Sequence, residues 1–189
     1  MAKKVVFGFS RPRNSYKIGA LLIRVFQGWT PYSHVFVSWD VPDLELDCIF
    51  EAWGTKVQFR SAPEFSHGNQ IVAAFEVKVS DERFIALRRK AHLIQGTPYA
   101  NLENVGIFAA AFLQKIFRRP FTNPFSFGEK QMKCSELALD LLDDIKELGL
   151  IHNLDLDLVD VKDVFSVLQN LSVSKDKTVM PLEAFRPRY

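Results

Sequence analysis

Cys134 has the surroundings of a nucleophilic thiol. It begins a segment in which leucine, alanine and isoleucine recur at helical spacing, and this pattern predicts a helix from Cys134 to about Leu148. A thiol at the start of a helix lies at the positive end of the helix dipole, beside backbone N–H groups that favour the thiolate and can hold an oxyanion. Cys134 shares a face with Leu137 and Leu141, so its sulfur should point into the protein. The alternative interpretation is a small buried hydrophobic residue.

His34 is the histidine best placed to act as a base for that thiol. It begins an apolar segment of strand type, His34 to Trp39, in which an unpaired imidazole would be costly to bury. The other histidines are His67 in a Ser-His-Gly-Asn loop, His92 in a charged helix and His152 in a loop. A core histidine with satisfied hydrogen bonds is the alternative interpretation of His34.

Glu51 is the candidate for the group that orients the base. It is the one charge in the apolar strand Ile49 to Trp53, which would neighbour the strand of His34 in a meander. The alternative is a strand carboxylate on the solvent face. Together, a cysteine at a helix start, a histidine at a strand start and a nearby carboxylate are typical of thiol hydrolases. Cys48 lies within a strand without activating neighbours and is interpreted as a packing residue.

The elements that must position these residues are predicted from hydrophobic periodicity and turn signals. Strands are expected at 5–9, 34–39, 47–53, 56–59 and 71–79, with Gly54 in the turn of a hairpin. Helices are expected at about 15–27, 80–95, 105–117, 134–148 and 160–171, and the tail from Pro181 should be irregular. This order predicts one α+β domain over residues 1–189.

Four segments in this order resemble the circularly permuted NlpC/P60 cysteine peptidases, and more narrowly their YiiX/YebB-like branch. They are Pro31-Tyr32-Ser33-His34-Val35, Phe50-Glu51-Ala52, Gly96-Thr97-Pro98-Tyr99 and Lys133-Cys134-Ser135-Glu136-Leu137. In that branch the histidine strand precedes the cysteine helix, as it does here. The resemblance covers about residues 5–148. Met132-Lys133 depart from the family, which has an aromatic residue before the cysteine.

The resemblance implies a papain-like fold, in which a small antiparallel sheet packs against the helix of the nucleophile. It implies that Cys134 is the nucleophile, His34 the base and Glu51 the third polar residue, with Tyr32 contacting substrate beside them. The implied reaction is cleavage of an amide bond, in a cell-wall-type (peptidoglycan) peptide. Lipid amide or ester hydrolysis and acyl transfer are alternatives, and so is a non-catalytic phage or bacterial structural module that keeps the fold.

Two segments lie outside the part that resembles the family most closely. Residues of about 100–130 are expected to form a helical insertion, interpreted as an extra core helix, as a lid over the Cys134 site or as a surface for a partner. Peripheral membrane contact through 105–127 is a further expectation for this segment. Residues of about 150–189 form a C-terminal extension for which the resemblance implies nothing.

Charge and composition limit the partners and the compartment. The 189 residues include 24 Lys and Arg against 22 Asp and Glu, a net charge of +2, which disfavours general nucleic-acid binding. No apolar run approaches the roughly 18 residues of a membrane span, and no signal peptide is recognisable. No metal-binding or phosphate-loop motif is present, so no metal or organic cofactor is expected. The expected location is the cytoplasm, or the virion if the chain is viral; the oligomeric state is left open.

Overall fold

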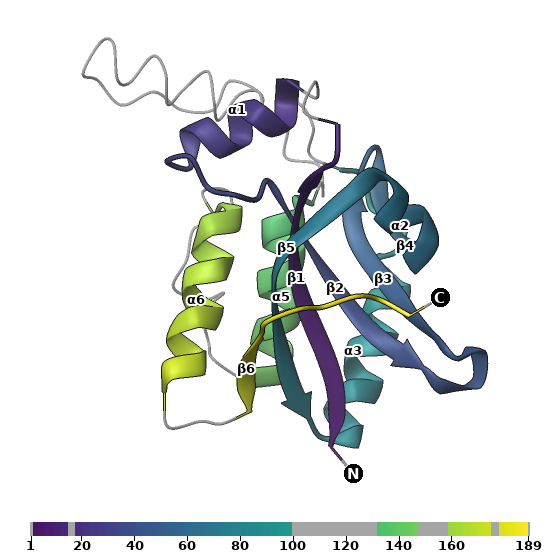
Figure 1. The fold of residues 1–189 in the computed structure, drawn as a ribbon. Coiled ribbons are helices and arrows are strands. Elements are labelled where there is room, and N and C mark those ends of the chain that lie inside the picture. The colour runs from purple at the N-terminus through teal and green to yellow at the C-terminus, as the bar shows by residue number, and fades with distance from the viewer. Residues whose placement is uncertain (1, 15–17, 100–131, 147–158, 175–177, 189) are drawn as a thin grey trace.

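A six-stranded antiparallel sheet forms the centre of the fold (Figure 1). The computed structural model describes residues 2–14, 18–99, 132–146, 159–174 and 178–188. The strands are β1 Lys3–Pro12, β2 His34–Val41, β3 Leu46–Trp53, β4 Lys56–Ser61, β5 Asn69–Val79 and β6 Val179–Leu182. Their order in the sheet is β4-β3-β2-β1-β5-β6. The predicted α+β class is therefore confirmed.

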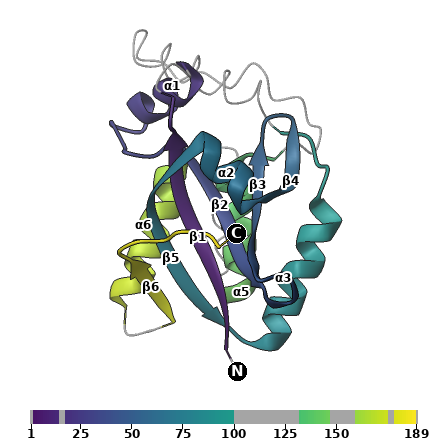
Figure 2. The same ribbon diagram turned by 45° about the vertical axis from the view of Figure 1, so that its right-hand side comes forward.

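The helices lie on both faces of this sheet and beyond one end of it. They are α1 Ile18–Phe26, α2 Ala62–Gly68, α3 Asp81–Ile94, α5 Cys134–Lys146 and α6 Val161–Val173, with a short 3-10 helix at Pro42–Leu44. Helices α3, α5 and α6 cover one face, whereas α2 and the C-terminal segment lie on the other (Figures 1 and 2). None of the described helices is long and apolar enough to cross a membrane.

Side-chain caps explain where three of the helices begin. Ser80 accepts a hydrogen bond from the backbone N–H of Arg83 at the start of α3. Asp160 and Asp163 form a reciprocal capping box at the start of α6. Ser61 accepts from the Glu64 N–H and begins α2, in which Pro63 occupies the first turn. The helix starts expected at 80 and 160 agree with these caps, whereas α2 was not predicted.

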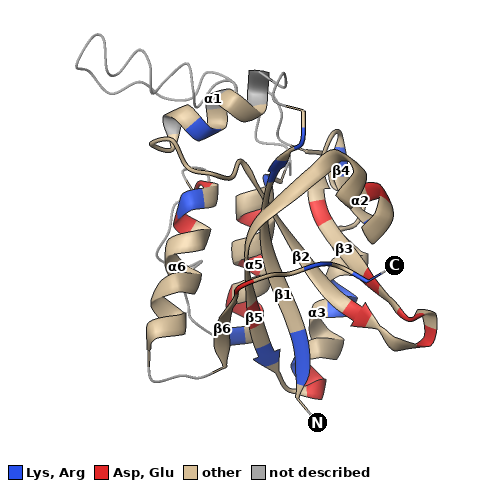
Figure 3. Ribbon diagram, viewed as in Figure 1, with Lys and Arg blue, Asp and Glu red and all other residues tan. Residues whose placement is uncertain are grey.

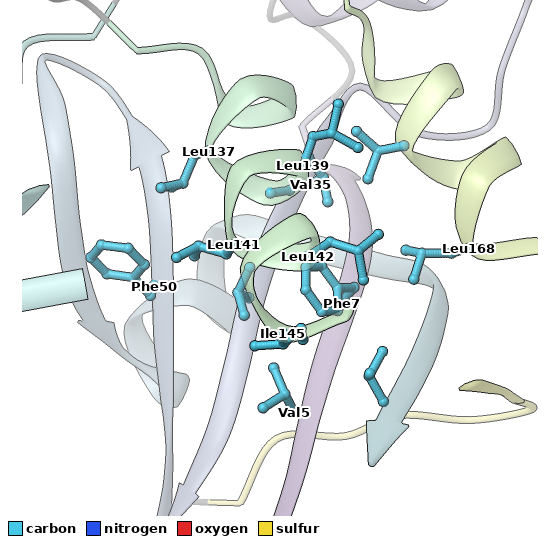
Figure 4. Close-up of a cluster of buried hydrophobic side chains, with 14 of the residues drawn as sticks. Val5, Phe7, Val35, Phe50, Leu137, Leu139, Leu141, Leu142, Ile145 and Leu168 are labelled. Carbon is cyan, nitrogen blue, oxygen red and sulfur yellow. The ribbon is translucent and has the colours of Figure 1, made fainter. Parts of the chain in front are cut away.

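The main core lies between α5 and the inner face of the sheet (Figure 4). Alternate residues of β1, among them Val5 and Phe7, point toward α5, which presents Leu137, Leu141 and Ile145 in return. Helix α6 adds Leu168 from the side (Figure 4). Side chains near both ends of α5 are fully buried against the sheet. This packing fixes the direction of the helix and therefore the position of Cys134, its first residue.

The opposite face of the sheet has a smaller core under α2. It consists of Phe36, Ile49, Ala62 and Phe65, with Phe185 of the C-terminal segment packed against it. Gly8 lies opposite Phe36 in the β1–β2 register, and the absence of a side chain there makes room for the Phe36 ring. A Cβ on Gly8 would lie 2.1 Å from Cζ of Phe36.

Within the described residues, the expected strands and helices are found, with shifts of a few residues at their ends. The expectation of an irregular tail from Pro181 is confirmed for residues 183–188 and wrong for Pro181 and Leu182, because β6 pairs with β5 from Ala74–Leu182 to Val77–Val179. Pro181 fits there since β6 is an edge strand, which leaves one side of its backbone without a ladder partner. His67 was expected in a loop and lies in α2.

The expected helix at 105–117 and the rest of the insertion at about 100–130 lie outside the described residues. Of the C-terminal extension, the described parts are α6 and β6 with the segment that follows it. Charged positions are spread over the helices and strands and are not gathered by sign on one face (Figure 3).

We expect Gly8→Ala to lower the free energy of unfolding by about 1–3 kcal/mol, because the Phe36 ring cannot move away from the new methyl group. Phe65 lies against that ring, with the two centroids 4.5 Å apart. Gly68→Ala is the matched control, since a Cβ at Gly68 would meet nothing within 4 Å. Urea unfolding of both variants measures the difference, and equal stabilities would contradict the packing of Phe36 on Gly8.

Candidate active site

Cys134 is the first residue of α5, and local hydrogen bonds define this helix start. The Lys133 carbonyl accepts from the Leu137 N–H at 2.9 Å, and the Glu136 carboxylate accepts from the Lys133 N–H at 3.3 Å. This arrangement is that of a helix cap at Lys133. The backbone N–H of Cys134 belongs to the first turn, where helix geometry provides no acceptor within the helix. The side chain of Cys134 is 6% exposed.

The sulfur of Cys134 meets β2 at the point where β2 and β3 separate. The described ladder between these strands runs from Val41–Leu46 to Val37–Phe50 and ends there. The backbone N–H of Val35, two residues beyond that end, donates a hydrogen bond to the Cys134 sulfur. Separation of the strands therefore provides a backbone donor for the thiolate, in addition to those of the helix.

His34 joins Cys134 to Glu51. Its Nε2 lies 2.7 Å from Oε2 of Glu51, and its ring is also hydrogen-bonded to the Cys134 side chain. Because Nε2 is engaged by the carboxylate, Nδ1 is the nitrogen that remains for the sulfur. His34 is 1% exposed and Glu51 is fully buried. The structure thus brings together the three residues that the sequence analysis selected as nucleophile, base and orienting group; their roles remain predictions.

Arg60 of β4 extends this chain of hydrogen bonds to a fourth residue. Its Nη1 donates to Oε1 of Glu51 at 2.7 Å, so the two oxygens of the carboxylate are held by two different cations. Arg60 is itself held by Glu64, through the carboxylate at 3.2 Å and the backbone carbonyl at 3.1 Å. The guanidinium also lies 5.8 Å from the ring centroid of Phe65.

The charges of these four side chains alternate in sign and stabilise one another. Burial by itself would lower the pKa of His34, but the charge of Cys134 and the hydrogen bonds to Cys134 and Glu51 raise this pKa to about 10. Burial would raise the pKa of the Cys134 thiol, yet His34, the Val35 N–H and Tyr99 together lower it. The pair therefore favours thiolate and imidazolium.

The Glu51 carboxylate remains ionised for a similar reason. Burial would raise its pKa, but the hydrogen bonds and positive charges of His34 and Arg60 lower it. A buried carboxylate with a single partner would be expensive, and here the second cation supplies the compensation.

Tyr99 is a further side chain at the sulfur, to which it is hydrogen-bonded. The turn between β3 and β4 holds its backbone, because the Tyr99 N–H donates to the Thr55 carbonyl at 2.9 Å. Tyr99 also forms a bridge with Met132, two residues before Cys134. Backbone pairing on both sides therefore places this tyrosine beside the nucleophile.

Tyr32, the predicted substrate contact, is 4% exposed and packs within the core. Its ring stacks on Phe165 of α6, with centroids 5.1 Å apart, and lies 5.2 Å from Phe9. Burial and the nearby charges of Asp160 and Asp163 raise its pKa to about 12. These contacts give Tyr32 a packing role, and the substrate contact remains a prediction.

The other cysteine and histidines have different surroundings. Cys48 is half-buried, and burial raises its pKa to about 11, against a smaller opposing effect of Arg88. The His92 ring lies 5.2 Å from that of Phe59, and His152 lies outside the described residues. Among the described residues there is no group of three His, Cys, Asp or Glu side chains that could hold a metal ion.

Sequence reasoning missed Arg60, Tyr99 and the Val35 N–H as parts of the site. A signal for Arg60 was present, because the two-residue turn at Gly54 pairs Glu51 with Gln58 and places Arg60 on the same face as Glu51. The Val35 N–H had no such signal, since its position depends on where the β2–β3 ladder ends.

Comparisons with protein family models, with curated proteins and with solved structures each found no match.

We expect Cys134 to react with iodoacetamide faster than Cys48 near neutral pH, because only its thiolate is stabilised. The rate at Cys134 should fall only as the pH drops through its lowered pKa, whereas Cys48 remains a thiol up to about pH 11. Peptide mass spectrometry after timed alkylation measures both rates in one sample. In His34→Ala the rate at Cys134 should drop. Equal rates with the same pH dependence would exclude an activated thiol.

We expect Arg60→Met to lower the free energy of unfolding by about 3 kcal/mol near pH 7, because it removes one cation from the buried Glu51 carboxylate. The folded pKa of Glu51 lies below its ordinary 4.5, so this contribution is present above that pH and is lost as Glu51 becomes protonated. The difference between wild type and variant should therefore narrow in acid.

Glu64→Ala is the control for this variant, since the Glu64 side chain is 65% exposed and should contribute less than about 1 kcal/mol. Urea unfolding over a pH series measures all three proteins. If the free energy of unfolding of wild type exceeded that of Arg60→Met by the same amount at every pH, Arg60 would contribute through packing alone.

Proposed function

We propose that this protein is a thiol hydrolase that cleaves an amide bond through Cys134, His34 and Glu51. The observation that carries this proposal is the buried hydrogen-bond chain from the thiol through the imidazole to the carboxylate. In this series of hydrogen bonds the proposed nucleophile contacts the proposed base, and the base contacts the proposed orienting group, as nucleophilic catalysis requires.

In the proposed reaction the Cys134 sulfur attacks the carbonyl carbon of the substrate amide. The carbonyl oxygen becomes an oxyanion, which the backbone N–H of Cys134 stabilises at the start of α5. His34, protonated at Nδ1 in the ion pair, gives this proton to the leaving amine as the C–N bond breaks. The product of this half-reaction is a thioester on Cys134.

The second half-reaction returns the enzyme to its starting state. His34, now neutral, takes a proton from a water molecule, which attacks the thioester carbon. The C–S bond breaks, the acid product leaves, and thiolate and imidazolium are formed again. Throughout the cycle Glu51 holds the ring through Nε2, so that Nδ1 remains directed at the sulfur.

A papain-like arrangement belongs to the same proposal. Its support is the packing of α5, which carries the cysteine, against an antiparallel sheet, with His34 on a neighbouring strand earlier in the chain. The chain order of histidine before cysteine is that of the permuted NlpC/P60 peptidases, so cell-wall-type peptides are the first substrates to test.

The cost of the buried charges argues against a purely structural module. Four ionised side chains, from Cys134 to Arg60, lie in or near the core, and an apolar set of similar volume is commonly as stable or more so. A purely structural domain would gain no stability from these buried charges, whereas a thiolate nucleophile and its base require charged partners.

We expect purified wild-type protein to release amines from one class in a panel of muropeptides, lipid amides and lipid esters. Cys134→Ala and His34→Ala should lose this activity to the background, and Glu51→Gln should lower kcat by at least about tenfold, since the amide no longer fixes the ring. Cys48→Ala is the control and should retain activity. A panel cleaved equally by wild type and Cys134→Ala would overturn the proposal.

A further inference from the structure

A groove on the face opposite α5 is separate from the cysteine site. It has a volume of about 470 Å³ and lies between the first half of β5, the end of α2 and the chain that follows β6. The β5 side is formed by the consecutive residues Asn69 to Ala74, and Arg13, Ser66 and Arg186 contribute to the rim.

The groove runs beside an unpaired strand edge. β6 pairs with β5 only from Ala74 to Val77, although β5 begins at Asn69. After Leu182 the chain leaves the sheet edge and crosses its face (Figure 1), where Phe185 packs near Phe36 and the Arg188 N–H binds Asp47. In the described part of the chain, the outer edge of residues 70–73 therefore has no strand partner, and three of these four residues are half-buried apolar side chains.

A buried acceptor in the groove also has no partner. The Asn69 side chain is 4% exposed, and its Nδ2 donates to the Phe65 carbonyl at 3.1 Å. Its Oδ1 is buried and accepts no hydrogen bond from any described residue. Buried polar atoms are rarely left in this state, so Oδ1, on a residue that lines the groove, is an acceptor for a donor from outside the described residues.

The rim of the groove is positively charged. Arg13 donates through Nε to the Ser66 carbonyl at 2.9 Å. Neither Arg13 nor Arg186 forms an ion pair with a described carboxylate, and Glu183 is the one acidic residue in the lining. Two exposed guanidinium groups, which favour bidentate carboxylate binding, therefore border the groove.

We infer that this groove binds an extended acidic peptide segment of a partner protein, which adds a strand to β5 along residues 70–73. Backbone hydrogen bonds to the β5 edge supply the affinity, as in other complexes formed by strand addition. A peptide N–H donates to Oδ1 of Asn69, and carboxylate side chains of the peptide bind Arg13 and Arg186. The β1–β5 register shifts by one residue between Phe9 and Ser10, so that Val72 is an extra residue within this edge.

The inference does not depend on catalysis, so binding alone tests it. A random heptapeptide library is selected on the wild-type protein, with the double variant Arg13→Glu, Arg186→Glu for counter-selection. Selected sequences are synthesised with a fluorescein label, and their affinities are measured by fluorescence anisotropy. Both arginines are exposed, so the double variant should fold, and its melting temperature is recorded.

We expect the selected peptides to be rich in Asp and Glu and to lack proline, which cannot donate to the strand edge. Their affinity should fall about tenfold or more in the double variant, through loss of charge-assisted hydrogen bonds. Arg89→Glu, an exposed arginine on α3, is the matched control and should leave affinity unchanged. N-methylation of alternate peptide amides should abolish binding, because it removes the donors that pair with β5.

Three results would overturn the inference: no sequence enriched over a protein-free selection, equal affinity for wild type and the double variant, or unchanged affinity of the N-methylated peptide. Loss of affinity in the double variant together with full binding of the N-methylated peptide would indicate a surface that attracts anions only, and the strand-addition proposal would fail.

Discussion

The buried hydrogen bond between His34 and Glu51 ties β2 to β3 where their backbone ladder has ended. An imidazole and a carboxylate in this position would be costly if each had only the other, because both are removed from water. The bond is stable since Cys134 lies on one side of it and Arg60 on the other, so that charges alternate along the set. Helix α5 and strands β2, β3 and β4 each contribute one of these four side chains. The packing of these elements holds the side chains in hydrogen-bonding positions.

This constraint explains why the site is at the end of the sheet. In a continuous ladder the Val35 N–H would be used by a neighbouring strand, whereas separation of β2 and β3 leaves it for the sulfur of Cys134. The dense packing of α5 on the inner face of the sheet allows little movement of the helix start. The thiol is therefore positioned by the core and not by a mobile loop, which suits a reaction that needs a fixed angle of attack.

Much of this arrangement could be predicted from local sequence. The stripe of leucines after Cys134 defines α5, and Gly54 between two strand-type segments defines the β3–β4 hairpin. His34 and Glu51 stand out because a single ionisable group in an apolar strand must find a partner. The α2 helix was missed because its seven residues are too short for periodicity to show, although Ser61 and Pro63 mark its start.

The remaining features depend on tertiary contacts that no local pattern contains. β6 was missed because a four-residue edge strand with a proline has no strand signal of its own and forms only against β5. Tyr99 reaches the sulfur through backbone contacts with Thr55 and Met132, both of which are distant from it in sequence.

The protonation state of His34 decides whether Cys134 and His34 form a thiolate–imidazolium pair. Nitrogen-15 NMR of the wild-type protein, with His34 assigned by comparison with His34→Gln, reports whether each ring nitrogen carries a proton. At about pH 8 an ordinary histidine is neutral. We expect His34, with its pKa raised to about 10, to be protonated on both nitrogens, and to become neutral at this pH in Cys134→Ala. A neutral His34 ring at about pH 8 in the wild-type protein would contradict the thiolate–imidazolium pair and the nucleophilic role of Cys134 that rests on it.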